Sequence, residues 1–146
     1  MPQKEDDFDS FVEQLQQEII DKEVSDFNEH IVSLFHNPKN WGKPSSYTVS
    51  QTYLGPHNDT MEFYLTIEDG IIKHANFFTD GCGATVATGS QTTLLIEGRP
   101  IEYAEKLKPE DIDRALLGLP EDHKHSLELA VTALRNLIEK YKKKLK

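Results

Sequence analysis

The chain has 146 residues, of which 37% are hydrophobic and 28% are charged, so it is long enough to form one domain with a substantial core. Its 25 acidic residues outnumber its 16 lysines and arginines and give a formal net charge of -9, which argues against a nucleic-acid-binding surface. The start carries no export or import pattern, and no segment approaches membrane-spanning length. We therefore expect a cytoplasmic protein that binds neither nucleic acid nor membrane.

The first part of the sequence has apolar residues at helical spacing. Phe8, Phe11 and Leu15 fall on one face of a first predicted helix, and Ile31 and Leu34 fall on one face of a second. The second helix is expected to stop at residues 37–38, where Asn precedes Pro. We predict a helical extension over residues 1–24, followed by one compact domain over residues 25–146.

The middle of the sequence has the period-two pattern of strands. Residues 47–54 form a first predicted strand. In residues 61–68 Met, Phe, Leu and Ile alternate with Glu, Tyr, Thr and Glu, which predicts one buried and one wetter face. Asp69-Gly70 is a preferred two-residue hairpin turn, so residues 71–78 should return as the partner strand.

Residues 83–97 fit either a helix or a further strand, because their threonines and valines lower helix propensity. Short helices are expected over residues 101–107 and 110–117, and the strongest apolar helical stripe runs from Leu127 to Tyr141. Helices, three antiparallel strands and then helices in this order predict an α+β fold with a three-stranded antiparallel sheet and helices mainly on one face.

The single cysteine, Cys82, lies between two glycines directly after the third predicted strand. A small buried residue in a tight turn is the common explanation of such a cysteine. However, the loop holding His57 and Asp59 and the start of the last helix, with His125, can meet Cys82 at one end of the sheet. Sulfur, imidazole and carboxylate donors together suit Zn²⁺ or Fe²⁺.

The sequence contains six motifs in this order: Phe35-His36-Asn37-Pro38-Lys39-Asn40-Trp41-Gly42, Gly55-Pro56-His57-Asn58-Asp59-Thr60-Met61, Asp80-Gly81-Cys82-Gly83-Ala84, Gly98-Arg99-Pro100, Leu119-Pro120 and His125-Ser126. Together they resemble the IscU/NifU family of iron-sulfur cluster scaffolds. The resemblance runs from about Phe27 to the C-terminus.

The resemblance implies a scaffold and not an enzyme. Such a scaffold receives sulfur from a cysteine desulfurase, assembles a [2Fe-2S] cluster on three cysteines with help from an aspartate, and passes the cluster to apo iron-sulfur proteins. In this sequence Cys82 matches the central cysteine, Asp59 matches the aspartate, and His125 matches the histidine before the third cysteine.

The departures from the family pattern are His57 in place of the first cysteine and Ser126 in place of the third. Two of three thiolates are therefore replaced, and imidazole substitution lowers the negative charge that the ligands bring to a cluster. The segment Leu119-Pro120-Glu121-Asp122-His123 departs from the family's Leu-Pro-Pro-Val-Lys motif, which argues against recognition by an Hsp70-type chaperone.

Three functions are consistent with this pattern. The first is a cluster assembly scaffold that binds iron or a [2Fe-2S] cluster through Cys82, Asp59 and His125. The second is a relative that holds zinc or iron through His57, Asp59, Cys82 and His125 without building clusters. The third is an interaction module with a vestigial site, and in each case we expect a monomer or a weak homo-oligomer.

Overall fold

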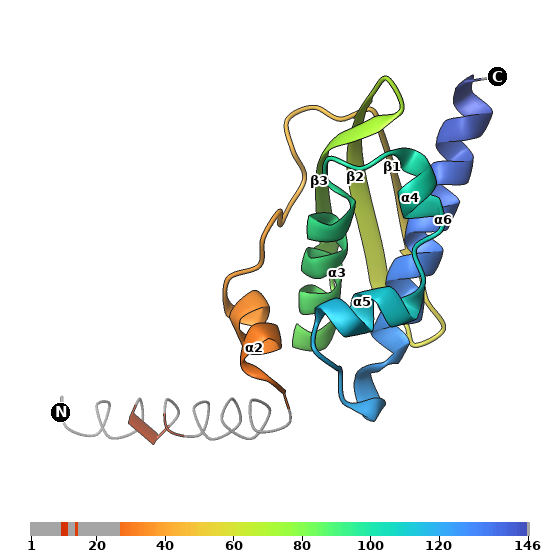
Figure 1. Cartoon of the computed structure of the whole chain (residues 1–146). Coiled ribbons are helices and arrows are strands. Elements are labelled where there is room, and N and C mark those ends of the chain that lie inside the picture. Colours follow the sequence, from red (N-terminus) through yellow and green to blue (C-terminus); the bar gives the residue numbers. More distant parts are fainter. Residues whose placement is uncertain (1–9, 12–13, 15–26, 146) are drawn as a thin grey trace, which may run out of the picture.

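The computed structural model describes residues 10–11, 14 and 27–145. Its elements in chain order are α2 (Glu29–His36), β1 (Val49–Leu54), β2 (Thr60–Glu68), β3 (Ile71–Thr79), α3 (Gly83–Ile96), α4 (Ile101–Glu105), α5 (Pro109–Ala115), the 3-10 turn η1 (Glu121–His123) and α6 (His125–Leu145) (Figure 1). The predicted extension over residues 1–24 lies outside the described residues, except for residues 10, 11 and 14, which are helical.

The three strands form one antiparallel sheet in the order β1-β2-β3, as predicted. Asp69 and Gly70 connect β2 to β3 with φ values of 54° and 75°. Positive φ at both turn residues matches the twist of a two-residue hairpin, which explains why this pair is preferred there. The first strand begins at Val49, slightly later than the sequence pattern suggested.

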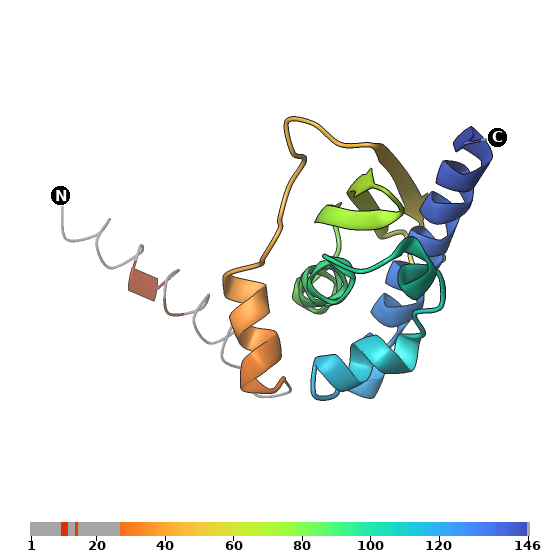
Figure 2. The same ribbon diagram turned by 45° about the horizontal axis from the view of Figure 1, so that its top comes forward.

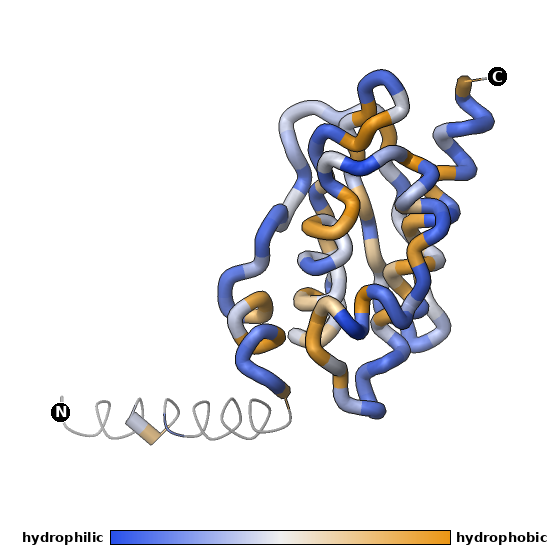
Figure 3. The backbone as a smooth tube through the Cα atoms, in the orientation of Figure 1, coloured by the Kyte–Doolittle hydropathy of each residue, from blue (hydrophilic) through white to orange (hydrophobic). Residues whose placement is uncertain are grey.

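The two longest described helices cover one face of the sheet. Helix α3 packs against β3, and α6 packs against β1 and β2, while α2 lies against α3 on the side away from α6 (Figure 2). Along α6 hydrophobic and hydrophilic segments alternate, as expected of a helix with one buried face (Figure 3). None of the helices in the described part of the chain has the length and apolarity needed to cross a bilayer.

The side of β2 that faces the helices is buried as predicted, with Met61, Phe63 and Leu65 fully inaccessible. Tyr64 was predicted to lie on the wetter face, and this prediction is wrong about its exposure, because the residue is only 5% exposed. The ring of Tyr47 packs against it with a centroid distance of 5.2 Å. Burial raises the pKa of Tyr64, and the neighbouring Glu62 raises it further.

Segment 83–96 is a helix and not a strand, and it is buried on nearly all sides. Its polar side chains are satisfied: Thr88 and Thr92 donate to backbone carbonyls four residues earlier, and Ser90 bonds to the backbone of Lys39. At Gly89 an added Cβ would overlap the ring of Phe77. The glycine therefore allows α3 to approach β3 closely.

Candidate metal centre

Three segments meet at the end of the sheet that lies away from the β2–β3 hairpin (Figure 1). They are the β1–β2 loop over residues 55–59, the β3–α3 corner over residues 80–83, and the chain from η1 into α6. We call this end the site pole. All four predicted site residues lie on these segments, because consecutive antiparallel strands place the β1–β2 loop and the end of β3 at the same edge.

His57, Asp59 and His125 form one group at the site pole. The rings of His57 and His125 lie with their centroids 4.6 Å apart, and His125 Nε2 lies 3.8 Å from Asp59 Oδ2. The Asp59 side chain is only 13% exposed, whereas His57 is exposed. This group supplies imidazole nitrogen and carboxylate oxygen but no sulfur.

The β1–β2 loop holds Asp59 close to α6. Gly55 N–H donates to Asp59 O at 2.8 Å, and Asn58 N–H donates to Gly55 O at 3.2 Å. A Cβ at Gly55 would lie 2.6 Å from Leu129 Cδ1 on α6. Glycine at position 55 therefore lets the loop pack directly on the helix that carries His125.

Cys82 is exposed and occupies the N-cap position of α3, where its side chain makes no capping hydrogen bond. Its Sγ lies 3.6 Å from Thr85 Oγ1 and 4.0 Å from Nδ1 of His123, so the sulfur is next to a hydroxyl and an imidazole. His123 was not among the predicted site residues. It lies two positions before His125, and η1 turns it toward Cys82 while His125 faces the β1–β2 loop.

Two buried hydroxyls lie between the Cys82 thiol and the group formed by the two histidines and Asp59. Thr85 Oγ1 lies 3.0 Å from Ser126 Oγ, and both residues are fully buried. Ser126 occupies the position that the resemblance aligns with the third cysteine. Among the described residues no three His, Cys, Asp or Glu side chains are positioned to hold a metal ion as they stand. The proposed ligand set therefore stays a prediction.

Asp80 connects the β1–β2 loop to the cysteine corner. Its Oδ1 accepts hydrogen bonds from Thr60 N at 2.8 Å and from Thr60 Oγ1 at 2.9 Å. Thr79 Oγ1 donates to Thr60 O and accepts from Gly81 N–H. Thr60 directly follows Asp59, and Asp80 comes two residues before Cys82. These bonds therefore fix the spacing between Asp59 and Cys82. The bonds from Thr60 lower the pKa of Asp80.

Asp80→Asn is expected to lower the free energy of unfolding at neutral pH and to have a smaller effect in acid. A depressed pKa in the folded state gives stability that is present above the ordinary value of 3.8 and lost as pH falls through the lowered one. Urea unfolding at neutral and acidic pH measures this. Asp122→Asn, at an exposed carboxylate without a side-chain partner in the described part, is the control. If Asp80→Asn lowered the free energy of unfolding equally at both pH values, the stabilising role of the Asp80 carboxylate would be contradicted.

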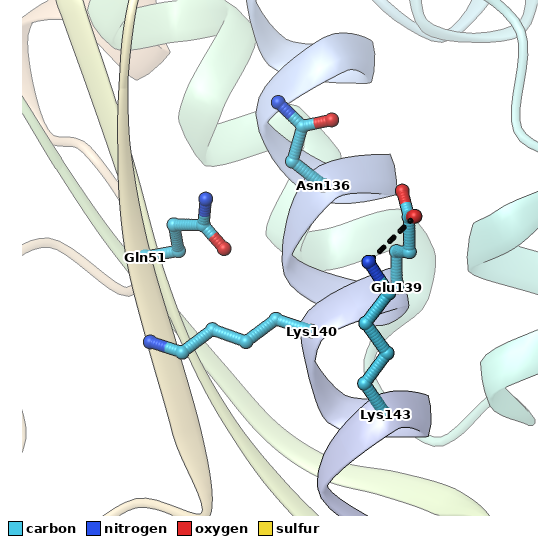
Figure 4. A pocket seen from close by; sticks show the side chains of 5 residues that line it. All are labelled: Gln51, Asn136, Glu139, Lys140 and Lys143. Atoms are coloured by element: carbon cyan, nitrogen blue, oxygen red, sulfur yellow. Dashed lines mark ion pairs between the residues drawn. The ribbon is translucent and has the colours of Figure 1, made fainter.

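A hollow of about 590 Å³ lies between β1 and the C-terminal half of α6, lined by Gln51, Asn136, Glu139, Lys140 and Lys143 (Figure 4). Both lysines that line it already have partners within the protein. Lys140 Nζ donates to Ser50 O at 2.9 Å, and Lys143 pairs with Glu139 at 3.3 Å. The hollow brings together no thiol or imidazole, so the site pole is the stronger candidate.

Residues 26–146 match the family model described as the NifU-like N terminal domain. This chain belongs to that family. The match includes every residue of the site pole, so the resemblance seen in the motifs is confirmed.

Relatives of this NifU-like chain carry names from iron-sulfur cluster assembly. The iron-sulfur cluster assembly scaffold protein IscU 1 of Archaeoglobus fulgidus is 34% identical over 119 residues, which cover 81% of this chain and 78% of the relative. The iron-sulfur cluster assembly protein IscU of Plasmodium falciparum is 32% identical over 126 residues, covering 84% and 77%. The crystal structure of a nitrogen-fixing NifU-like protein (N-terminal) from Brucella abortus has a TM-score of 0.64 at 18% identity and covers 83% of this chain and 98% of that one, which supports the α+β fold.

Proposed function

We propose that this chain is a scaffold of iron-sulfur cluster assembly that binds iron or a [2Fe-2S] cluster as cargo at the site pole. The observation that carries the proposal is the family match over residues 26–146, within which His57, Asp59, Cys82 and His125 lie on three segments that meet at one end of the sheet. The names of the archaeal and protozoan relatives support the scaffold role.

The donors at the site pole suit an iron cargo. Cys82 supplies the sulfur, at a helix N-terminus whose backbone N–H groups and partial positive charge favour an anionic neighbour. Asp59 supplies a carboxylate, and His57 and His125 supply imidazoles. Together these are the borderline donors that bind Fe²⁺ and Zn²⁺. The scaffold role needs no catalytic residue, and we assign none.

A second candidate is a zinc- or iron-binding relative that does not build clusters. One observation favours it: Ser126, at the third cysteine position, offers a neutral hydroxyl that bonds to Thr85 in place of a thiolate. His57 replaces one thiolate and Ser126 replaces another. The ligand set therefore has two fewer negative charges than three cysteines would give it. A single divalent ion tolerates this loss better than a cluster does.

The proposed partners follow from the scaffold role. We infer a cysteine desulfurase as the sulfur donor and apo iron-sulfur proteins as acceptors. The segment before α6 carries exposed Glu121 and Asp122 where the family's chaperone motif has proline and valine. An Hsp70-type chaperone that selects that apolar motif would therefore not recognise this chain well.

Anaerobic addition of Fe²⁺ and sulfide tests the proposal. The expected result is visible sulfur-to-iron charge-transfer absorption that the wild-type protein gains and Cys82→Ala does not, because Cys82 is the only cysteine. The wild-type spectrum should persist after gel filtration. A colourless protein that instead retains one equivalent of zinc would overturn the scaffold proposal and favour the second candidate.

A further inference from the structure

Two exposed aromatic rings lie next to each other at the outer edge of β3. The loop that follows α2 passes along this edge, where Gly42 N–H donates to Phe77 O and Phe77 N–H donates to Asn40 O. These bonds hold Trp41 beside the strand, with its ring centroid 5.2 Å from that of Phe78. Trp41 is 43% exposed and Phe78 is 44% exposed. Two adjacent large aromatic side chains in contact with water form an unpartnered apolar surface.

Two lysines flank Trp41 in the sequence. Lys39 and Lys43 are both exposed, and within the described part of the chain neither forms an ion pair with a carboxylate. Glu62, on the neighbouring strand, accepts a hydrogen bond from Thr52 on β1. We call the surface made of Trp41, Phe78, Lys39 and Lys43 the edge patch. Its rings and cations fit an amphipathic helix with apolar and acidic faces.

The N-terminal extension of this chain has that chemistry. Its predicted helix has an apolar stripe made of Phe8, Phe11, Val12, Leu15 and Ile19. Residues 1–26 contain nine acidic residues and only two lysines, so most of the formal net charge of -9 lies in the extension. Phe11 is one of the described residues, and it is helical and 58% exposed. The stripe therefore includes a ring that is itself uncovered.

The extension is long enough to reach the edge patch. It joins the domain at Phe27, whose ring packs against His123 with a centroid distance of 5.0 Å. From there the eight residues of α2 advance about 12 Å to the loop that carries Trp41. Residues 20–26 can span about 23 Å when extended, so residues 8–19 can fold back beside α2 and lie over the patch.

We propose that the apolar stripe of the extension packs on the edge patch of its own chain. Phe11 then covers the rings of Trp41 and Phe78, and acidic side chains of the extension pair with Lys39 and Lys43. Docking removes both apolar surfaces from water and leaves the patch closed to other proteins. The inference does not rest on the proposed function, because no residue of the site pole takes part.

Trp41 is the only tryptophan, so its fluorescence reports on the edge patch in the full-length protein. In Phe8→Ser/Phe11→Ser the emission should shift to longer wavelength. Quenching by acrylamide should rise on the order of twofold, because docking removes the water-facing side of the ring from solvent. High salt should raise quenching in the wild-type protein but not in this variant, since salt screens the lysine–carboxylate contacts.

Gln14→Ser/Gln17→Ser is the matched control. It introduces the same number of serines on the polar face of the same predicted helix, so it lowers helix propensity without changing the stripe. We expect its emission and quenching to equal those of the wild-type protein. Circular dichroism and urea unfolding check that the domain of each variant is folded.

Two results would overturn the inference. One is the same emission and quenching in Phe8→Ser/Phe11→Ser as in the wild-type protein, because Trp41 would then have no cover to lose. The other is protection of Trp41 that appears only as protein concentration rises, together with a dimer mass in sedimentation, since the extension of a second copy would then occupy the patch. Failure to form a cluster with iron and sulfide would count against the proposed function alone.

Discussion

Restoring cysteine at positions 57 and 126 is expected to turn a weak cluster site into a strong one. The double variant His57→Cys/Ser126→Cys would place three thiolates on the segments that meet at the site pole. We expect the fraction of protein that keeps a cluster after gel filtration, and the lifetime of that cluster, to rise on the order of tenfold or more. A thiolate that binds the cluster directly affects its stability more than a residue that only positions a ligand.

The fold should accept both substitutions. His57 is exposed on a loop, so its side chain is not part of the core. Ser126 is fully buried, but cysteine has nearly the same shape, and the cost is the weakened bond to Thr85, about 1 kcal/mol. Anaerobic reconstitution with iron and sulfide, followed by visible absorption, measures the gain.

The matched control for this gain is Ser45→Cys/His74→Cys. It adds the same number of thiols from the same residue types at two exposed positions, one in the loop before β1 and one on β3. If thiol content alone stabilised iron and sulfide, the control would match the designed variant. Equal cluster retention in the two proteins would contradict the placement of the site at this pole.

Phe77→Ala is expected to lower the free energy of unfolding by about 3–5 kcal/mol. The ring of Phe77 is fully buried on β3, lies edge-on to the Trp41 ring at 5.3 Å, and fills the space that Gly89 leaves on α3. Truncation removes its apolar burial and leaves a cavity between sheet and helix. A loss of this size is a large share of the stability of a single domain.

Phe78→Ala is the control, because Phe78 lies next to Phe77 on the same strand and also contacts Trp41, at 5.2 Å. Its side chain points to the opposite face and is 44% exposed, so we expect a loss below about 1 kcal/mol. Urea unfolding at equilibrium measures both variants. Similar losses for the two would show that the layer between β3 and α3 is not the core described here.

The hairpin and its faces could be predicted because local signals agree there. The alternation in β2, the Asp69-Gly70 turn and the following strand all favour one register. Helix α3 could not be assigned, because burial on nearly all sides removes its amphipathic pattern and its threonines are equally typical of strands. Tyr64 was misplaced because the loop that carries Tyr47 covers it, and no local pattern shows that contact.

The sequence could predict that four candidate residues lie at one end of the sheet, but not how their side chains are arranged there. The order of motifs identified His57, Asp59, Cys82 and His125. The sequence could not show that Cys82 contacts His123 while His125 contacts Asp59, because this depends on how η1 turns the chain into α6. The Asp80–Thr60 bonds likewise depend on tertiary packing.

The most direct test of the metal centre is a crystal structure of the protein loaded with Fe²⁺ without chelator, measured at the iron absorption edge. We predict an anomalous peak at the site pole, within bonding reach of His125 and of at least one neighbouring donor among His57, Asp59 and Cys82. A peak located elsewhere, such as the lysine-lined hollow beside α6, or no peak at full iron loading, would contradict the account.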